Sequence, residues 1–236
     1  MDWRERDGVR WLEADLGGAR AAFSTRLGGV SDAPFDELNL GILTADDQEA
    51  VTENRRRLAA ALGLEPEEIV YALQVHGTRL LRRPSDESLP EADGHVVTEA
   101  GVAPMVLAAH CLPIALYGRG GLAMVHAGWR GLAGGIVEAA AAAVEASTAA
   151  IGPGIGACCY EVGEEVLDAL GDLGDGIAAG RMLDLPGVAR RKLAQAGVVR
   201  VEAAGLCTSC EPELFFSHRR DRGRTGRQAG IAWIES

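Results

Sequence analysis

The sequence predicts an α+β fold, a single domain in which mixed β-sheets are flanked by helices. Short runs of apolar, strand-forming residues recur along the chain, and helical patterns interrupt them. Strands and helices do not alternate strictly, which argues against a doubly wound parallel sheet. No long Pro- and Ser-rich linker divides the 236 residues, and the weakest join is the polar loop RRPSDESLPEADG. We therefore predict one domain over residues 1–236.

In chain order, the predicted strands are short apolar runs that stop at turn-forming or charged residues. They cover residues 20–24, 69–73, 79–82, 95–98, 105–109, 114–117, 122–126, 198–201 and 230–234. Longer segments carry apolar residues at helical spacing, at 48–62, 132–147, 161–170 and 188–196. Asp46 and Asp47 precede the first of these helices and are its N-cap candidates.

The chain is acidic, with 34 Asp and Glu against 23 Lys and Arg and a formal net charge of −11. Such a charge repels phosphate backbones, so we predict no nucleic-acid partner. No apolar stretch approaches the ~20 residues that a membrane-spanning helix needs. The charged start MDWRERDGVRW also lacks the apolar core of a secretion signal. We expect a cytoplasmic protein without a membrane partner, present as a monomer or a weak homo-oligomer.

The five cysteines do not form the even, spaced pattern of a secreted disulfide framework. Cys158 and Cys159 are adjacent, and Cys207 and Cys210 form a C-x-x-C. A structural zinc normally needs a second pair beside a C-x-x-C, and the only histidine near it in sequence is His218. The sequence therefore favours reduced thiols and an incidental pair over a zinc knuckle.

Three residues are candidates for metal ligands or for a nucleophile and its base. His76, Cys111 and His126 each lie where a short apolar run meets a turn, in VYALQVHG, PMVLAAHCLP and LAMVHAGWRG. One thiolate with two imidazoles suits zinc, and three protein ligands leave a fourth position for water or substrate. Each residue alone has an ordinary explanation, as a strand-capping histidine or a small buried thiol. Three such residues in similar settings favour a metal site.

Other segments could bind an anion. Arg26 stands just before a Gly-Gly turn. The stretch AMVHAGWRGLAGG, which contains Arg130, is typical of a strand, a glycine-rich turn and the start of a helix, where free amides can bind phosphate. The segment FFSHRRDRGRTGRQAG carries five arginines within nine positions. If this segment faces the site, it would attract an anionic co-substrate.

Several of these segments together resemble one family. They are QVHG around His76, ADG at Asp93, CLPIAL from Cys111, HAGWRGLAGG from His126, IGACCYEVGEEV from Ile155, and FFSHRRD with TGR near the end. They are similar to the multicopper polyphenol oxidoreductase (laccase) family, also called the peptidoglycan editing factor or purine nucleoside phosphorylase family. The resemblance extends from about Phe23 to Trp233 and so covers nearly the whole chain.

This resemblance implies a fold similar to the catalytic domain of cytotoxic necrotizing factor toxins. It implies a single metallo-enzyme domain, with His76, Cys111 and His126 as catalytic metal ligands and Zn²⁺ as the cofactor. The implied activity is phosphorolysis of purine nucleosides (adenosine, inosine, guanosine and methylthioadenosine) by inorganic phosphate, with adenosine deamination as a second activity. Arg26 and Arg130 would then contact the substrate or the phosphate.

The chain departs from the family pattern at the residue before the site cysteine. His110 stands where the family usually has Asp, which changes the charge and the pKa at that position and puts deamination most in doubt. On a strand, His110 and Cys111 would point to opposite faces, which argues against His110 as a further ligand. His218 stands where Tyr is commoner.

Three alternatives remain open. The first is a metal-free cysteine hydrolase or deamidase, with Cys111 as nucleophile and His126 as base. The second is copper-dependent phenol oxidation, as the laccase name implies. A four-copper oxidase needs roughly ten imidazoles, and this chain has five histidines and no His-x-His, so the ligand count excludes a true laccase and leaves only turnover by adventitious copper. The third is a non-enzymatic role in cell-wall or protein-quality binding.

Overall fold

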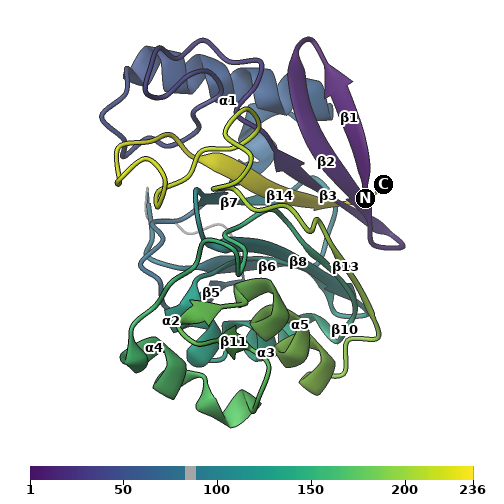
Figure 1. Cartoon of the computed structure of the whole chain (residues 1–236). Helices are drawn as coiled ribbons and strands as arrows, with labels where there is room; N and C mark the ends of the chain where they lie inside the picture. The colour runs from purple at the N-terminus through teal and green to yellow at the C-terminus, as the bar shows by residue number, and fades with distance from the viewer. Residues whose placement is uncertain (83–88, 236) are drawn as a thin grey trace.

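Two mixed β-sheets lie one above the other in the computed structural model, which describes residues 1–82 and 89–235. The upper sheet in Figure 1 has the order β1-β2-β3-β14-β7-β4 and the lower sheet the order β13-β10-β8-β9-β6-β5. Upper-sheet strands are β1 (Asp2–Arg6), β2 (Val9–Asp15), β3 (Ala19–Ser24), β14 (Gln228–Ile234), β7 (Ala103–Ala108) and β4 (Ile69–Val70). Lower-sheet strands are β13 (Arg200–Ala203), β10 (Ala146–Ile151), β8 (Leu112–Gly118), β9 (Gly121–Ala127), β6 (Gly94–Val97) and β5 (Leu80–Leu81).

The space between the sheets is filled by alternate residues of their strands. Leu122 and Met124 of β9 belong to the same buried cluster as Phe23 of β3, whereas Ala123 and Val125 belong to the cluster on the opposite face. Because successive side chains of a strand point to opposite faces, His126 shares the inward face of β9 with Leu122 and Met124. The strand thus delivers an imidazole to the edge of the inter-sheet space.

Helices cover the outer faces of both sheets (Figure 1). Helix α1 (Gln48–Leu62) packs on the upper sheet through Leu58 and Ala61, which lie in one cluster with Trp11 and Ile231. The helices α2 (Trp129–Ala133), α3 (Ile136–Val144), α4 (Glu164–Ala169) and α5 (Leu185–Gln195) lie below the lower sheet. Short elements complete the chain: η1 (Pro66–Glu68), η2 (Gly171–Leu173), β11 (Ala178–Ala179) and β12 (Met182–Leu183).

The predicted α+β class with mixed sheets in one domain is confirmed, and helix α1 has the predicted bounds. Asp47 is its N-cap and accepts a hydrogen bond of 3.2 Å from the amide of Glu49. The prediction of one helix over 132–147 is wrong at both ends. Gly134 and Gly135 separate α2 from α3, and Glu145 ends α3 with a left-handed backbone, φ 47°. The chain then enters β10, a strand whose Ala-rich sequence does not distinguish it from a helix.

Strands β1 and β2 are not predicted from the sequence, because their charged residues obscure the apolar alternation of a strand. The predicted strands at 69–73 and 79–82 shrink to the two-residue strands β4 and β5. Residues 83–88 of the polar loop predicted as the weakest join lie outside the described residues. Among the helices that the structure describes, none has the length and apolar character to cross a bilayer.

Candidate functional site

His76, Cys111 and His126 meet at one edge of the space between the sheets. His76 lies in the loop between β4 and β5, Cys111 in the connection from β7 to β8, and His126 near the end of β9. One ligand atom from each residue lies within 4.8 Å of the others, and the two imidazole rings stack edge to face at 5.0 Å. His76 is exposed, Cys111 half-buried and His126 buried, so the cluster extends from solvent into the core.

The connection that carries Cys111 also changes the expectation for His110. Residues 109–111 form a tight bend that carries the chain from one sheet to the other and belong to neither strand. His110 therefore does not point away from Cys111, and both line the same cavity. The His110 ring packs edge to face on Tyr160 at 4.7 Å, and a hydrogen bond from His110 helps to lower the pKa of the Cys111 thiol.

Asp93 organises this cluster from behind. Its fully buried carboxylate accepts hydrogen bonds from three successive amides, of Val75 (3.1 Å), His76 (3.0 Å) and Gly77 (2.7 Å). It also lies 2.8 Å from Nδ1 of His126. A carboxylate at Nδ1 keeps the proton there and leaves the Nε2 lone pair for a metal, as outer-shell carboxylates do in zinc sites.

The position of His76 depends on further backbone contacts. The side-chain amide of Gln74 exchanges two hydrogen bonds of 2.8 Å with the backbone of Leu107, which fastens the loop to β7. His76 has a left-handed backbone with φ 61°, a conformation that non-glycine residues rarely adopt and that often marks functional positions. A Cβ at Gly128 would come within 2.8 Å of Cys111 Sγ and 3.4 Å of the His76 ring. Gly128 therefore gives the two ligands room to converge.

The charges of the metal-free cluster are coupled. Burial raises the pKa of Cys111, but the charge of His126 and hydrogen bonds from the three neighbouring histidines bring it well below its usual value. Burial lowers the pKa of His126, but the Cys111 thiolate and Asp93 outweigh it and raise the pKa to about 9. Without a metal, these shifts favour the thiolate form of Cys111 and the imidazolium form of His126, because each charge stabilises the other. Asp93 keeps a lowered pKa, because hydrogen bonds from His126 and Gly77 outweigh its burial.

The cluster opens into a cavity of about 640 Å³. Among its lining residues are Arg55, Arg130, Arg219 and Arg227, and the described lining includes no Asp or Glu. None of these four arginines forms an ion pair with a described carboxylate, and Nη2 of Arg55 is buried without a hydrogen-bond partner. In an acidic protein, this lining is a local concentration of positive charge.

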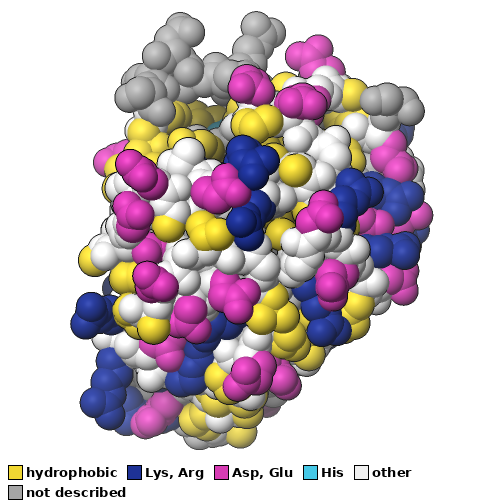
Figure 2. Space-filling view, turned by 90° about the horizontal axis from the view of Figure 1, so that it is seen from above, with side chains coloured by type: hydrophobic (Ala, Val, Ile, Leu, Met, Phe, Trp, Pro, Cys, Tyr) yellow, Lys and Arg dark blue, Asp and Glu magenta, His cyan; other side chains and the backbone are white. Residues whose placement is uncertain are grey.

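The outer surface differs from this lining. On the face shown in Figure 2, acidic and basic side chains are interspersed. Arginines outside the cavity are often paired, as Arg56 is with Glu53 at 2.7 Å. Three of the four cavity arginines instead lie over aromatic rings. Arg55 lies over Tyr71 at 4.3 Å, Arg130 over Trp129 at 4.3 Å and Arg219 over Tyr160 at 5.5 Å.

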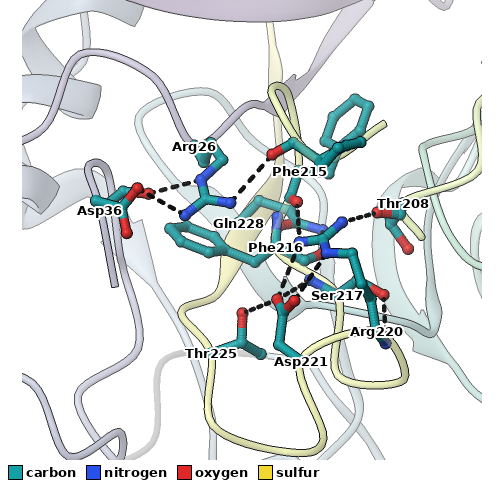
Figure 3. Close-up of polar contacts among 11 residues, drawn as sticks. Arg26, Asp36, Thr208, Phe215, Phe216, Ser217, Arg220, Asp221, Thr225 and Gln228 are labelled. Atoms are coloured by element: carbon teal, nitrogen blue, oxygen red, sulfur yellow. Dashed lines mark hydrogen bonds and ion pairs between the residues drawn. The ribbon is translucent and has the colours of Figure 1, made fainter. Parts of the chain in front are cut away.

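The two arginines predicted to contact substrate have different surroundings. Arg130 lines the cavity, whereas Arg26 does not. Arg26 donates from Nε to the Asp36 carbonyl at 2.6 Å, pairs with the Asp36 carboxylate at 3.0 Å and lies over the Phe216 ring (Figure 3). These contacts tie the loop that follows β3 to the segment before β14.

The arginines of the segment before β14 have three different environments. Arg219 and Arg227 reach the cavity, and Arg222 and Arg224 are exposed. Arg220 folds back into its own loop: it pairs with Asp221 at 2.7 Å and donates to the carbonyl oxygens of Thr208 and Phe215 at 2.9 Å each (Figure 3). This bracing holds its neighbour Arg219 toward the cavity.

Sequence reasoning missed Asp93 and Arg55 as site residues. Asp93 was visible only as part of an ADG motif, and nothing local reveals that its carboxylate meets amides 75–77 and a histidine on another strand. Arg55 looks like one of several solvent-facing arginines on helix α1, because the cavity wall it joins forms only after folding.

Comparisons with known proteins agree with this architecture. The family described as multi-copper polyphenol oxidoreductase laccase matches residues 20–235. Purine nucleoside phosphorylase YfiH from Shigella flexneri is 38% identical over 231 residues, which cover 92% of this chain and 94% of that protein. A purine nucleoside phosphorylase from Xylella fastidiosa strain Temecula1 is 41% identical over 231 residues, covering 87% of this chain and 88% of that protein.

A solved structure extends the similarity to the fold. The crystal structure of YlmD from Geobacillus stearothermophilus matches with a TM-score of 0.88 at 34% identity, over 99% of this chain and 98% of that one. The expected similarity to the cytotoxic necrotizing factor domain stays a prediction. With a family match over nearly its whole length and close relatives of the same size, the chain belongs to the multi-copper polyphenol oxidoreductase laccase family, which includes the YfiH-type proteins named purine nucleoside phosphorylases.

Proposed function

We propose that this protein is a zinc-dependent purine nucleoside phosphorylase, which cleaves the bond between ribose and purine with inorganic phosphate. The observation that carries the proposal is the two-histidine, one-cysteine cluster at the wall of a cavity lined by four arginines without described acidic partners. The names of the relatives support the same reaction. The nucleosides we propose are adenosine, inosine, guanosine and methylthioadenosine.

The donor set fits zinc. Zinc–nitrogen bonds of ~2.1 Å and zinc–sulfur bonds of ~2.3 Å place tetrahedral ligand atoms ~3.5 Å apart, which the cluster can reach with small side-chain shifts. Asp93 holds one imidazole in the tautomer that a metal needs. A zinc ion bound there would supply a Lewis acid with one coordination position left for a reactant. Copper accepts imidazole and thiolate ligands as well, so both metals belong in the test.

The cavity arginines are suited to bind the phosphate co-substrate. Phosphorolysis needs a phosphate dianion held against C1′ of the ribose while positive charge develops on the sugar. Planar guanidinium groups offer paired N–H donors that match phosphate oxygens. Arg55 and Arg227 are partly desolvated, and burial lowers the pKa of each, so an anion that restores their lost interactions is favoured.

The cavity also suits a purine. Its volume of about 640 Å³ lies within the range typical of small-molecule sites. Tyr71, Trp129 and Tyr160 line it and offer flat faces on which a base can stack. His110 lines the cavity beside Cys111 and is not one of the three proposed metal ligands, so we propose that it donates a proton to the departing purine.

Incubation with nucleoside and phosphate tests the proposal. The zinc-loaded protein is expected to release adenine, hypoxanthine or guanine together with ribose 1-phosphate, and to release neither without phosphate. Inosine formed from adenosine without phosphate would report deamination, which we propose as a second activity. Parallel samples loaded with copper, assayed with both nucleosides and a phenol, test the laccase name. No base release at any metal loading would overturn the proposal.

A second candidate function rests on a specific arrangement. Cys111, His126 and Asp93 are also ordered as a thiol nucleophile, its base and a carboxylate that orients the base. A metal-free hydrolase or deamidase would use this set and would have no need of His76. Stoichiometric zinc at this site counts against that reading, whereas rapid alkylation of Cys111 in metal-free active protein supports it.

A further inference from the structure

The remaining four cysteines meet beside one end of the parallel strands β10 and β13. Cys158 and Cys159 lie in the loop after β10, and Cys207 and Cys210 lie in the loop after β13. These two strands are parallel neighbours, so the loops leave the sheet at the same edge. A parallel bridge between Gly154 and Cys207 continues the pairing into the loops. Two pairs separated by about fifty residues in the chain thus become one cluster.

The sulfur positions match a single tetrahedral ion. All four Sγ atoms lie within 4.8 Å of one another, and Cys210 Sγ is 3.4 Å from that of Cys158 and 3.5 Å from that of Cys159. A zinc ion with four Zn–S bonds of ~2.3 Å separates its sulfurs by ~3.8 Å. A four-iron cluster would need a wider spread, because each cysteine binds a different iron atom.

The backbone around Cys207 is arranged to stabilise a thiolate. The Gly156 amide donates to Cys207 Sγ at 3.2 Å, and amides of Ser209 and Cys210 also bond to it. Burial raises the pKa of Cys207, but these amides outweigh it and lower the pKa overall. The pKa of Cys210 is raised, above all by its bonds to the other thiols. The backbone amides around Cys207 thus already offer the donors that a metal-bound thiolate accepts.

We propose that Cys158, Cys159, Cys207 and Cys210 bind one zinc ion as a closed tetrathiolate site, separate from the cluster around Cys111. A disulfide explains the geometry less well. Cys210 Sγ lies at nearly equal distances from Cys158 and Cys159, and it can form a disulfide with only one of them, whereas one ion satisfies all four sulfurs. When zinc binds, the thiols that are still protonated release their protons to solvent, and no oxidant is involved.

The proposed site would act as a clamp between two loops that form the cavity wall. The first loop continues from Cys159 directly into Tyr160, and the second continues from Cys210 toward His218 and Arg219. Arg219 lies over the Tyr160 ring and donates to the Glu161 carbonyl at 3.0 Å, so the loops also meet beyond the cysteines. With all four positions taken by cysteine, this ion would have no open position for substrate.

Zinc stoichiometry tests the proposal. Native mass spectrometry and elemental analysis of the full chain, purified under reducing conditions, are expected to give two zinc ions in the wild type. We expect one ion in Cys111→Ala, one in Cys158→Ser/Cys210→Ser and none in the combined variant. Cys158 and Cys210 are the exposed members, so their replacement disturbs packing least. Ser209→Ala, between the C-x-x-C cysteines, is the matched control and is expected to keep both ions.

A second measurement does not depend on variants that might not fold. Cobalt titrated into metal-free wild type is expected to give the intense visible bands of a tetrahedral tetrathiolate beside those of the two-histidine site. Retention of both ions in Cys158→Ser/Cys210→Ser would overturn the proposal. So would wild-type protein with one zinc and no tetrathiolate cobalt spectrum. Metal-free protein whose four cysteines resist alkylation until a reductant is added would also overturn it, because that result reports disulfides instead of a metal site.

Discussion

The two thiol clusters of this protein differ in ligand number, and that difference separates chemistry from architecture. His76, Cys111 and His126 provide three ligands at the wall of a cavity, with Asp93 oriented behind them. Cys158, Cys159, Cys207 and Cys210 provide four, at the junction of two loops. Three ligands leave a coordination position for a reactant, whereas four leave none. Loss of the first cluster should therefore remove activity, and loss of the second should lower stability.

The largest expected effect is on activity. Cys111→Ala should lower kcat/KM for nucleoside phosphorolysis by ~10³-fold or more, because it removes a ligand from the proposed reactive metal. Its Tm should stay within a few degrees of wild type. Steady-state assays and differential scanning calorimetry measure both quantities. Activity near wild type in this variant would mean that the cluster has no catalytic role.

The pH dependence of zinc binding should separate the clusters further. Since Cys111 and Asp93 raise the pKa of His126 to about 9, zinc must displace a proton from this imidazole at neutral pH. Affinity at the cavity site should therefore rise by about tenfold per pH unit, on the order of 100-fold from pH 7 to 9, and then level off. Chelator competition in the Cys158→Ser/Cys210→Ser background measures it. A flat profile would mean that His126 is already neutral.

Removing the carboxylate behind His126 should affect only the cavity site. Asp93→Asn is expected to lower zinc affinity there by ~10–100-fold, because it weakens the acceptor of the Nδ1 proton and of amides 75–77. The exposed neighbour Glu91 offers the matched control, Glu91→Gln, which should leave affinity unchanged. Equal losses in both variants, or zinc lost from the four-cysteine site of Asp93→Asn, would contradict the assignment.

The cavity arginines should contribute to phosphate binding alone. Arg55→Gln is expected to raise KM for phosphate by ~10-fold, equivalent to a charge-assisted hydrogen bond, while zinc content stays constant. Arg56→Gln, its neighbour on α1 that pairs with Glu53, should change KM less than twofold. Initial rates at varied phosphate and saturating nucleoside measure KM for phosphate in both variants. If both variants behave alike, the anion binds elsewhere.

The smallest effect on activity is expected from the loss of the four-cysteine site. At 25 °C Cys158→Ser/Cys210→Ser should keep kcat within ~3-fold, since its proposed ion touches no substrate. Its Tm should fall by ~10 °C, because the free energy of a structural zinc is folding free energy. Thermal scans with and without added zinc, run beside Ser209→Ala, measure the shift. A Tm equal to that of the control would mean that the four-cysteine site does not stabilise the fold.

Much of the fold and of the cavity cluster could be predicted from the chain alone. Helix α1 has local signals for both ends, Asp47 at its start and Gly63 with φ 73° at its end. Strand β10 does not, because a run of Ala, Ser and Thr favours neither state until β8 and β13 flank it. His110 shows the same limit. Whether its side chain faces Cys111 depends on a bend between two sheets, and the spacing of residues in the sequence does not predict that bend.

Composition and motif determined the class of fold, the family and the three metal-ligand candidates, because apolar periodicity and residue chemistry are local properties. Only the tertiary structure decided which distant groups meet. It brought Asp93 to His126, gathered arginines from α1, from the first turn of α2 and from the segment before β14, and joined a C-x-x-C to an adjacent cysteine pair. Hydrogen bonds and coordination act over a few ångströms, and those distances are set only when the strands pair and the helices and loops pack against them.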